Sequence, residues 1–143
     1  MTISPLLGPV VALVAWSLIM LTWLAIVRFR AIARAGGSIK GARGTRGQDL
    51  DQTLPREANW PAHNYAHLME QPTIFYAIVF ALVLMGFDQP INVWLAWGYV
   101  ALRILHSLVQ ATVNIVALRF VLFMLATLCL LSLTVHAALR LLH

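Results

Sequence analysis

Residues 6–27 read LLGPVVALVAWSLIMLTWLAIV and contain no charged side chain. At about 1.5 Å of rise per residue, a helix of this length crosses the ~30 Å hydrocarbon core of a bilayer. The apolar run ends in the basic sequence Arg28-Phe29-Arg30, and no basic residue precedes it. The stretch therefore predicts a retained transmembrane helix, rather than a cleaved signal peptide, with a positively charged end.

The composition extends this interpretation to the whole chain. Of its 143 residues, 61% are hydrophobic and 10% are charged, and the mean hydropathy is +0.82. A soluble domain of this size has no core large enough for so much apolar surface, whereas lipid solvates the outer faces of membrane helices. We expect one all-α membrane domain over residues 1–143, a four-helix bundle with spans at about 6–28, 61–86, 91–112 and 118–141.

A long basic segment, residues 29–58, separates the first two predicted spans. It holds most of the lysines and arginines of the chain, together with glycines that oppose a continuous helix beyond about Arg34. Because basic loops stay on the cytoplasmic side, we predict a cytoplasmic loop here and both termini on the opposite side. The net charge of +5 comes largely from this segment, so it fits membrane topology and indicates no nucleic-acid partner.

The second predicted span is the least regular. Residues 73–86 are apolar but too short to cross a membrane alone, so the helix must extend backwards through polar sequence. We expect Asn59 to cap its start, with Pro61 in the first turn. Pro72 removes the hydrogen bond to the carbonyl of Leu68, which predicts a kink.

Ionisable and other strongly polar side chains inside the predicted spans fall at one depth, in the cytoplasmic half. Such groups are costly in lipid, turn inward and mark functional sites. They comprise His63, His67 and Glu70 at helical spacing on the second span, Arg103, His106 and Gln110 on the third, Arg119 at the start of the fourth, and Arg28 at the end of the first. We therefore predict a positively charged pocket that is open to the cytoplasm and to lipid.

Each of these charges also has a plain structural interpretation. Glu70 and Arg103 are expected to form an ion pair, because neither charge is tolerable alone in lipid. That pair is either a structural contact or part of a ligand site. Arg28 and Arg119 are likewise either anion-binding groups or topology anchors that extend to the membrane surface.

A metal site is the competing interpretation of the second span. The spacing His63-x-x-x-His67-x-x-Glu70 places three possible ligands on one helix face. Membrane di-iron enzymes need several such histidine boxes, and this chain has five histidines in total. We therefore expect no bound metal.

The sequence from His63 to Tyr76, HNYAHLMEQPTIFY, resembles the second-helix signature of the MAPEG family, the membrane-associated proteins in eicosanoid and glutathione metabolism. The resemblance extends along most of the chain. Arg28-Phe29-Arg30 is similar to the basic end of the family's first helix. Leu102-Arg103-Ile104-Leu105-His106 is similar to its third-helix Arg-x-x-His, and Arg119 follows at the family's interval.

The resemblance implies a four-helix bundle that assembles as a homotrimer and binds glutathione between subunits near the cytoplasmic face. Arg28 would hold a carboxylate of glutathione, Glu70 its amine, and Arg119 the catalytic thiolate. The pocket would also include His63, His67, Arg103 and His106. The implied activity is that of a glutathione-dependent transferase or peroxidase acting on lipophilic electrophiles, in a bacterial inner-membrane protein with both termini periplasmic.

Several positions differ from the eukaryotic members of that family. His63 and His67 stand where an Arg and an Asn are expected, and Gln110 replaces a Tyr. Phe120 and Phe123 replace the Ser and the Tyr that follow the fourth-helix Arg in one branch. These replacements favour an alternative, a non-enzymatic trimeric scaffold that acts as a lipid-binding or accessory subunit, whereas the retained arginines and the retained glutamate favour an enzyme.

Overall fold

The computed structural model describes residues 3–38, 40–41 and 43–142. Over these residues every regular element is a helix, which confirms the predicted all-α fold. In chain order the elements are α1 (Leu7–Arg34), the 3-10 helix η1 (Gly47–Gln52), α2 (Arg56–Leu68), α3 (Gln71–Leu84), α4 (Pro90–Ala111) and α5 (Val116–Leu142).

Three helical segments are long and apolar enough to cross a membrane: α1, the α2–α3 segment Arg56–Leu84, and α5. Large apolar side chains on their outer faces, such as Val11 and Leu131, are exposed. These faces suit contact with lipid, because only lipid solvates them without cost. Helix α4 has 22 residues but carries a buried polar stripe, and it is not among the three. A bundle of four spans therefore stays a prediction.

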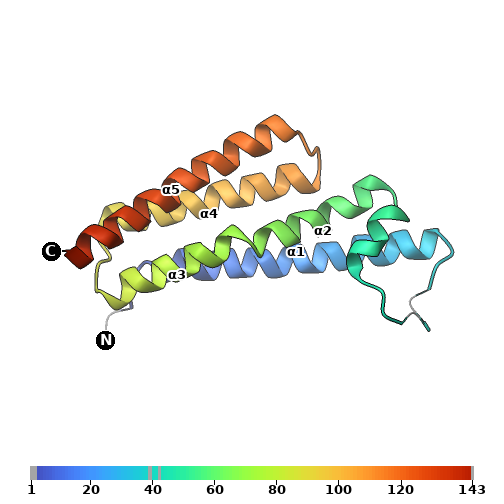
Figure 1. Cartoon of the computed structure of the whole chain (residues 1–143), viewed down its shortest axis with the longest axis horizontal. Coiled ribbons are helices and arrows are strands. Elements are labelled where there is room, and N and C mark those ends of the chain that lie inside the picture. Colours follow the sequence, from blue (N-terminus) through green and yellow to red (C-terminus); the bar gives the residue numbers. More distant parts are fainter. Residues whose placement is uncertain (1–2, 39, 42, 143) are drawn as a thin grey trace.

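The helices pack side by side with their long axes roughly aligned (Figure 1). Helix α4 packs along α5, and α1 packs against α2; α4 also contacts α1 and α2, while α3 contacts α5. The start of α1 and the end of α5 lie at one end of the molecule, and η1 lies at the other (Figure 1). The predicted basic loop therefore lies at the end of the molecule opposite the start of α1 and the end of α5.

The first helix continues well past the predicted span, to Arg34, as the sequence beyond Arg30 allowed. It ends where Gly36 adopts a φ of +70°, a left-handed conformation that glycine reaches without strain. The N–H of Gly37 then donates to the carbonyl of Ile32 at 3.0 Å, which closes the last turn. The basic end of α1 thus extends beyond the apolar run toward η1.

The start of the second span differs from the prediction. The helix begins at Arg56, directly after Pro55, so Pro61 lies inside it rather than in its first turn. Asn59 is no cap: its side chain is buried, and its Nδ2 donates to the carbonyl of Asp51 at 3.5 Å. The chain between α1 and α2 folds back against α2, and this long-range contact takes the amide that local sequence assigns to capping.

The predicted interruption near Pro72 is confirmed. Helix α2 ends at Leu68 and α3 begins at Gln71, with Pro72 in its first turn. Between them Glu70 has a ψ of −96°, outside the helical range. The second span is therefore two helices in sequence, and the carbonyl groups around the break are available to side chains.

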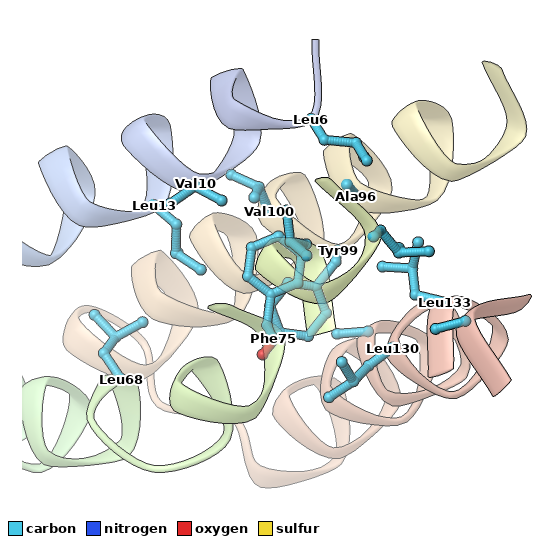
Figure 2. Packing of buried hydrophobic residues seen from close by; sticks show 14 of the residues in the cluster. Leu6, Val10, Leu13, Leu68, Phe75, Ala96, Tyr99, Val100, Leu130 and Leu133 are labelled. Atoms are coloured by element: carbon cyan, nitrogen blue, oxygen red, sulfur yellow. The ribbon is translucent and has the colours of Figure 1, made fainter. Parts of the chain in front are cut away.

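An aromatic pair lies at the centre of the apolar core. The rings of Phe75 on α3 and Tyr99 on α4 stack with their centroids 4.3 Å apart. Figure 2 shows leucines and valines of α1, including Leu13, and leucines of α5, including Leu130, gathered around this pair. A stack of this kind adds about 0.5–1.5 kcal/mol beyond the packing itself. It joins α3 to α4 at the point where side chains of α1 and α5 also meet.

Candidate functional site

A fully buried arginine marks the meeting point of α2, α4 and α5. Arg103 is 0% exposed, and its Nη2 donates to the carbonyl of His67 at 3.0 Å. That carbonyl lies in the last turn of α2, where the break interrupts the helical hydrogen bonds. The Nε and Nη1 groups of Arg103 are also buried, and they have no hydrogen-bond partner in the described part of the chain. A buried cation with free donors results.

Aromatic and imidazole rings surround this guanidinium. The ring centroid of His67 lies 5.1 Å from that of His106 and 5.4 Å from that of Phe123. The Cζ atom of Arg103 lies 5.8 Å from the centroid of the Phe123 ring, within range for a cation–π contact. His106 is also buried. We call these four residues, together with Glu70, the arginine–histidine cluster.

The predicted ion pair between Glu70 and Arg103 is not formed among the described residues. Instead, an oxygen of Glu70 lies 2.9 Å from Nδ1 of His67, and the Glu70 side chain is 68% exposed. Glu70 occupies the break itself, so helical spacing no longer fixes its direction. The prediction was wrong because it extended the helical spacing of His63 and His67 to Glu70, which lies beyond the end of α2 at Leu68.

Arg119 approaches the cluster from the first turn of α5, one turn before Phe123. Its Nη1 donates to Oδ1 of Asn114 at 2.7 Å, and its Nε is buried without a partner in the described residues. Asn114 has a φ of +53°, a conformation that asparagine tolerates better than most side chains. The connection between α4 and α5 therefore holds Arg119 in place and leaves one donor free.

A second polar group joins α1, η1 and α2. Asp51 bridges two predicted site residues: one carboxylate oxygen lies 2.9 Å from Nη2 of Arg28, and the other lies 2.9 Å from Nε2 of His63. We call this arrangement the Asp51 bridge. A Cβ at Gly47 would lie 2.7 Å from Nη1 of Arg28, so the loop approaches this arginine as closely as glycine permits.

The Asp51 bridge forms one side of an open pocket of about 480 Å³. Its other walls come from the end of α1, the loop before η1 and one face of α2. The lining residues are Leu24, Arg28, Arg46, Gly47, Gln48, Asp51, Ala62, His63, Tyr65 and Ala66. The Nε of Arg28 is buried without a partner in the part of the chain that the structure describes. The pocket is therefore polar where the Asp51 bridge lines it and apolar where Leu24, Ala62 and Ala66 line it.

The predicted site residues thus fall into two neighbouring groups rather than one. Arg28 and His63 belong to the Asp51 bridge, whereas the others surround Arg103. Helix α2 connects the groups, since His63 and His67 are one turn apart. Sequence reasoning missed Asp51, which is one of three carboxylates in this mainly basic loop and which no spacing distinguishes from the other two.

A buried polar seam between α2 and α4 includes Gln110, which the sequence indicated, together with Asn64 and Ser107, which sequence reasoning missed. Nδ2 of Asn64 donates to the hydroxyl oxygen of Ser107, and both side chains are fully buried. Oδ1 of Asn64 and Oε1 of Gln110 are buried acceptors that have no partner within residues 43–142 or the rest of the described chain. The signal for Ser107 was its place directly after His106 in the polar part of α4. The described residues contain no group of three or more side chains that could hold a metal ion.

These features place the chain among integral membrane proteins whose polar and charged side chains meet between closely packed helices. A family model described as MAPEG family matches residues 6–139, and the chain belongs to this family. Members of the family are associated with glutathione in general. No curated protein and no solved structure gives a match to the chain.

Proposed function

We propose that this protein is a glutathione-dependent transferase or peroxidase that acts on lipophilic electrophiles. One observation carries the proposal: Arg28, Arg103 and Arg119 each keep a buried guanidinium N–H group without a hydrogen-bond partner in the described residues. Unpaired buried donors on a charged group are costly, and an anionic ligand satisfies them. Glutathione has two carboxylates and an ionisable thiol, so its charges match three cationic groups.

The residues fit such a ligand in distinct roles. Arg28 would bind a carboxylate at the open pocket, while Glu70, which is exposed at the break, would bind the amine. Arg119 would stabilise the thiolate, because a nearby guanidinium favours the charged form of a thiol. When bound, glutathione supplies the nucleophilic sulfur. The pocket would be completed by His63, His67, Arg103 and His106.

The surroundings of Arg119 suit a substrate that arrives from the bilayer. Phe120 follows Arg119 directly and is 63% exposed on the outer face of α5. Phe123 lies one turn further on and packs against the two histidines. A lipophilic electrophile could therefore approach the arginine along aromatic side chains. We also propose a homotrimer of four-span subunits, because the pocket beside the Asp51 bridge is open on one copy of the chain and large apolar side chains stay exposed on the outer helix faces.

The distribution of charge supports a topology for this proposal. The loop end carries most of the arginines, whereas the end with both termini carries few basic side chains among the described residues. We propose that the loop and the site face the cytoplasm and that both termini are periplasmic in a bacterial inner membrane.

One observation favours a different function, a non-enzymatic scaffold that binds lipid or serves as an accessory subunit. Asp51 already occupies Arg28 and His63, and Asn114 already occupies Arg119. These internal partners neutralise or satisfy part of the charge that a ligand would use. If these internal contacts persist when glutathione is added, neither the guanidinium of Arg28 nor that of Arg119 is available to bind a carboxylate of glutathione.

Calorimetry on the full chain in detergent distinguishes the two functions. Glutathione should release heat on binding to the wild type, and Arg103→Gln should abolish it. Arg119→Gln should retain binding but lose the ultraviolet absorbance of the thiolate. The matched control is Arg34→Gln, since Arg34 is an exposed arginine in the last turn of α1, away from both groups. No heat with millimolar glutathione, or equal loss in the control, would contradict the enzyme proposal.

A further inference from the structure

The opposite end of the molecule contains a second polar arrangement, centred on a buried amide. Asn92, in the first turn of α4, is 0% exposed. Its Nδ2 donates to the carbonyl of Phe87 at 3.0 Å, in the turn between α3 and α4. That bond fixes which side of the amide is nitrogen and which is oxygen. The Oδ1 atom of Asn92 consequently faces α5.

On α5, His136 meets this oxygen. Nδ1 of His136 lies 2.7 Å from Oδ1 of Asn92. An amide oxygen only accepts hydrogen bonds, so Nδ1 of the histidine must carry the proton. In the neutral ring, Nε2 then presents a lone pair. That nitrogen makes no hydrogen bond with the described residues, and it is not among their buried polar atoms.

The ring of His136 forms one wall of a small pocket of about 280 Å³, which Phe87, Leu139 and Arg140 complete. The Cζ atom of Arg140 lies 5.5 Å from the centroid of the Phe87 ring, so the guanidinium rests on the aromatic face. Arg140 forms no ion pair with a described carboxylate. We call this space the far pocket; it combines a cation, the Nε2 atom of an imidazole and an apolar floor.

The depth of the far pocket indicates its environment. It lies where the α3–α4 turn meets the C-terminal part of α5, at the end of the molecule opposite η1 (Figure 1). A turn between membrane helices marks the level of the lipid headgroups, where basic side chains meet phosphate and apolar side chains meet acyl chains. Arg140 and His136 are one turn apart, so both face that level together.

We propose that the far pocket binds the headgroup of a phospholipid that carries a hydrogen-bond donor, such as an ethanolamine or a glycerol headgroup. The phosphate lies against Arg140, and the ammonium or hydroxyl group of the headgroup donates to Nε2 of His136. The acyl chains run over Leu139 and Phe87. A choline headgroup offers the phosphate but no N–H or O–H donor, so it satisfies only half of the pocket. This site is separate from the arginine–histidine cluster.

Native mass spectrometry of the full chain, released from nanodiscs of mixed composition, tests the proposal. The wild type should retain phosphatidylethanolamine or phosphatidylglycerol about tenfold over phosphatidylcholine, as one additional hydrogen bond to a headgroup suggests. Arg140→Gln should lose retention of all three lipids. The matched control Arg34→Gln removes an arginine from the last turn of another helix and should behave as the wild type.

A second variant separates the two contacts. His136→Phe should keep lipid retention but lose the preference over phosphatidylcholine, because it removes only the acceptor. Since His136→Phe leaves Oδ1 of Asn92 without its donor and can impair folding, Arg140→Gln carries the test by itself; Arg140 makes no hydrogen bond to a described residue. Equal retention of all headgroups by the wild type, or unchanged retention in Arg140→Gln, would overturn the proposal.

Soluble phosphates distinguish the lipid from a free ligand. Inorganic phosphate and glycerophosphoethanolamine share the headgroup chemistry but lack acyl chains. At millimolar concentration they should leave the retained lipid in place. Displacement by either compound would show that the far pocket binds a soluble phosphate ester rather than a lipid, and would overturn the inference.

Discussion

The guanidinium of Arg103 on α4 donates a hydrogen bond to the carbonyl of His67, in the last turn of α2 beside the break before α3. The break and the buried arginine therefore depend on each other. The interruption makes a main-chain acceptor available, and the arginine satisfies it. The same contact leaves Nε and Nη1 of Arg103 buried without a hydrogen-bond partner among the described residues.

Replacing Arg103 with methionine should loosen the chain around the break. The carbonyl of His67 would lose its donor, and a hydrogen bond to a charged group is worth about 1.5–3 kcal/mol. Hydrogen exchange at residues 66–73 should therefore accelerate by roughly tenfold or more, as measured by mass spectrometry in detergent. Arg103→Lys keeps one donor and should show a smaller effect. Unchanged exchange in Arg103→Met would mean that the contact does not hold the break.

Asp51→Asn should release both partners of the Asp51 bridge. The amide cannot form ion pairs with Arg28 and His63, so η1 should exchange its amide hydrogens faster than in the wild type. Under the proposed function, glutathione should bind several-fold more tightly, since its carboxylate would no longer compete with an internal one. Calorimetry measures this change. Weaker binding would instead place Asp51 among the groups that hold the ligand. Asp49→Asn, in the same 3-10 helix, is the control.

Gln71→Met should destabilise the contact among α3, α4 and α5. The amide of Gln71 accepts from the hydroxyl of Tyr99 at 3.2 Å and donates to Thr127 at 2.9 Å. Thr127 keeps its bond to the carbonyl of Phe123, but the hydroxyl of Tyr99 loses its partner. We expect a loss of about 1–3 kcal/mol in the free energy of unfolding. Tryptophan fluorescence monitors the unfolding transition and measures this loss.

The double variant Gln71→Met/Tyr99→Phe provides the matched control for that prediction. Removing the hydroxyl of Tyr99 also removes the unsatisfied group, so much of the lost stability should return. If the double variant is as unstable as the sum of the two single variants, the hydrogen bond between Gln71 and Tyr99 contributes nothing measurable.

Much of the fold followed from properties of the local sequence. The apolar run before Arg28 predicted α1, and the preference of glycine for left-handed conformations explains its end near Arg34. The missing N–H of Pro72 predicted the interruption of the second span. Each of these features depends on residues within a few positions of one another, so no knowledge of the tertiary structure was needed.

The features that sequence reasoning missed depend on contacts between distant segments. Asp51 meets Arg28 only because η1 folds back over α1, and the same fold removes Asn59 from its expected role as a cap. Helical spacing placed Glu70 toward Arg103, but the break redirected it. Periodicity describes one uninterrupted helix, and it fails where the chain leaves that geometry.

The start of α1 and the end of α5 lie at the same end of the molecule, far from η1 (Figure 1). In a bilayer this geometry allows the orientation of the protein to be measured with attached reporters. A compartment-sensitive enzyme or fluorophore attached beside residue 3 or residue 142 would lie in the same aqueous phase. One inserted beside Gly44 would sample the other. Three reporter fusions, one at each of these positions, therefore measure directly which end of the molecule faces which side of the membrane.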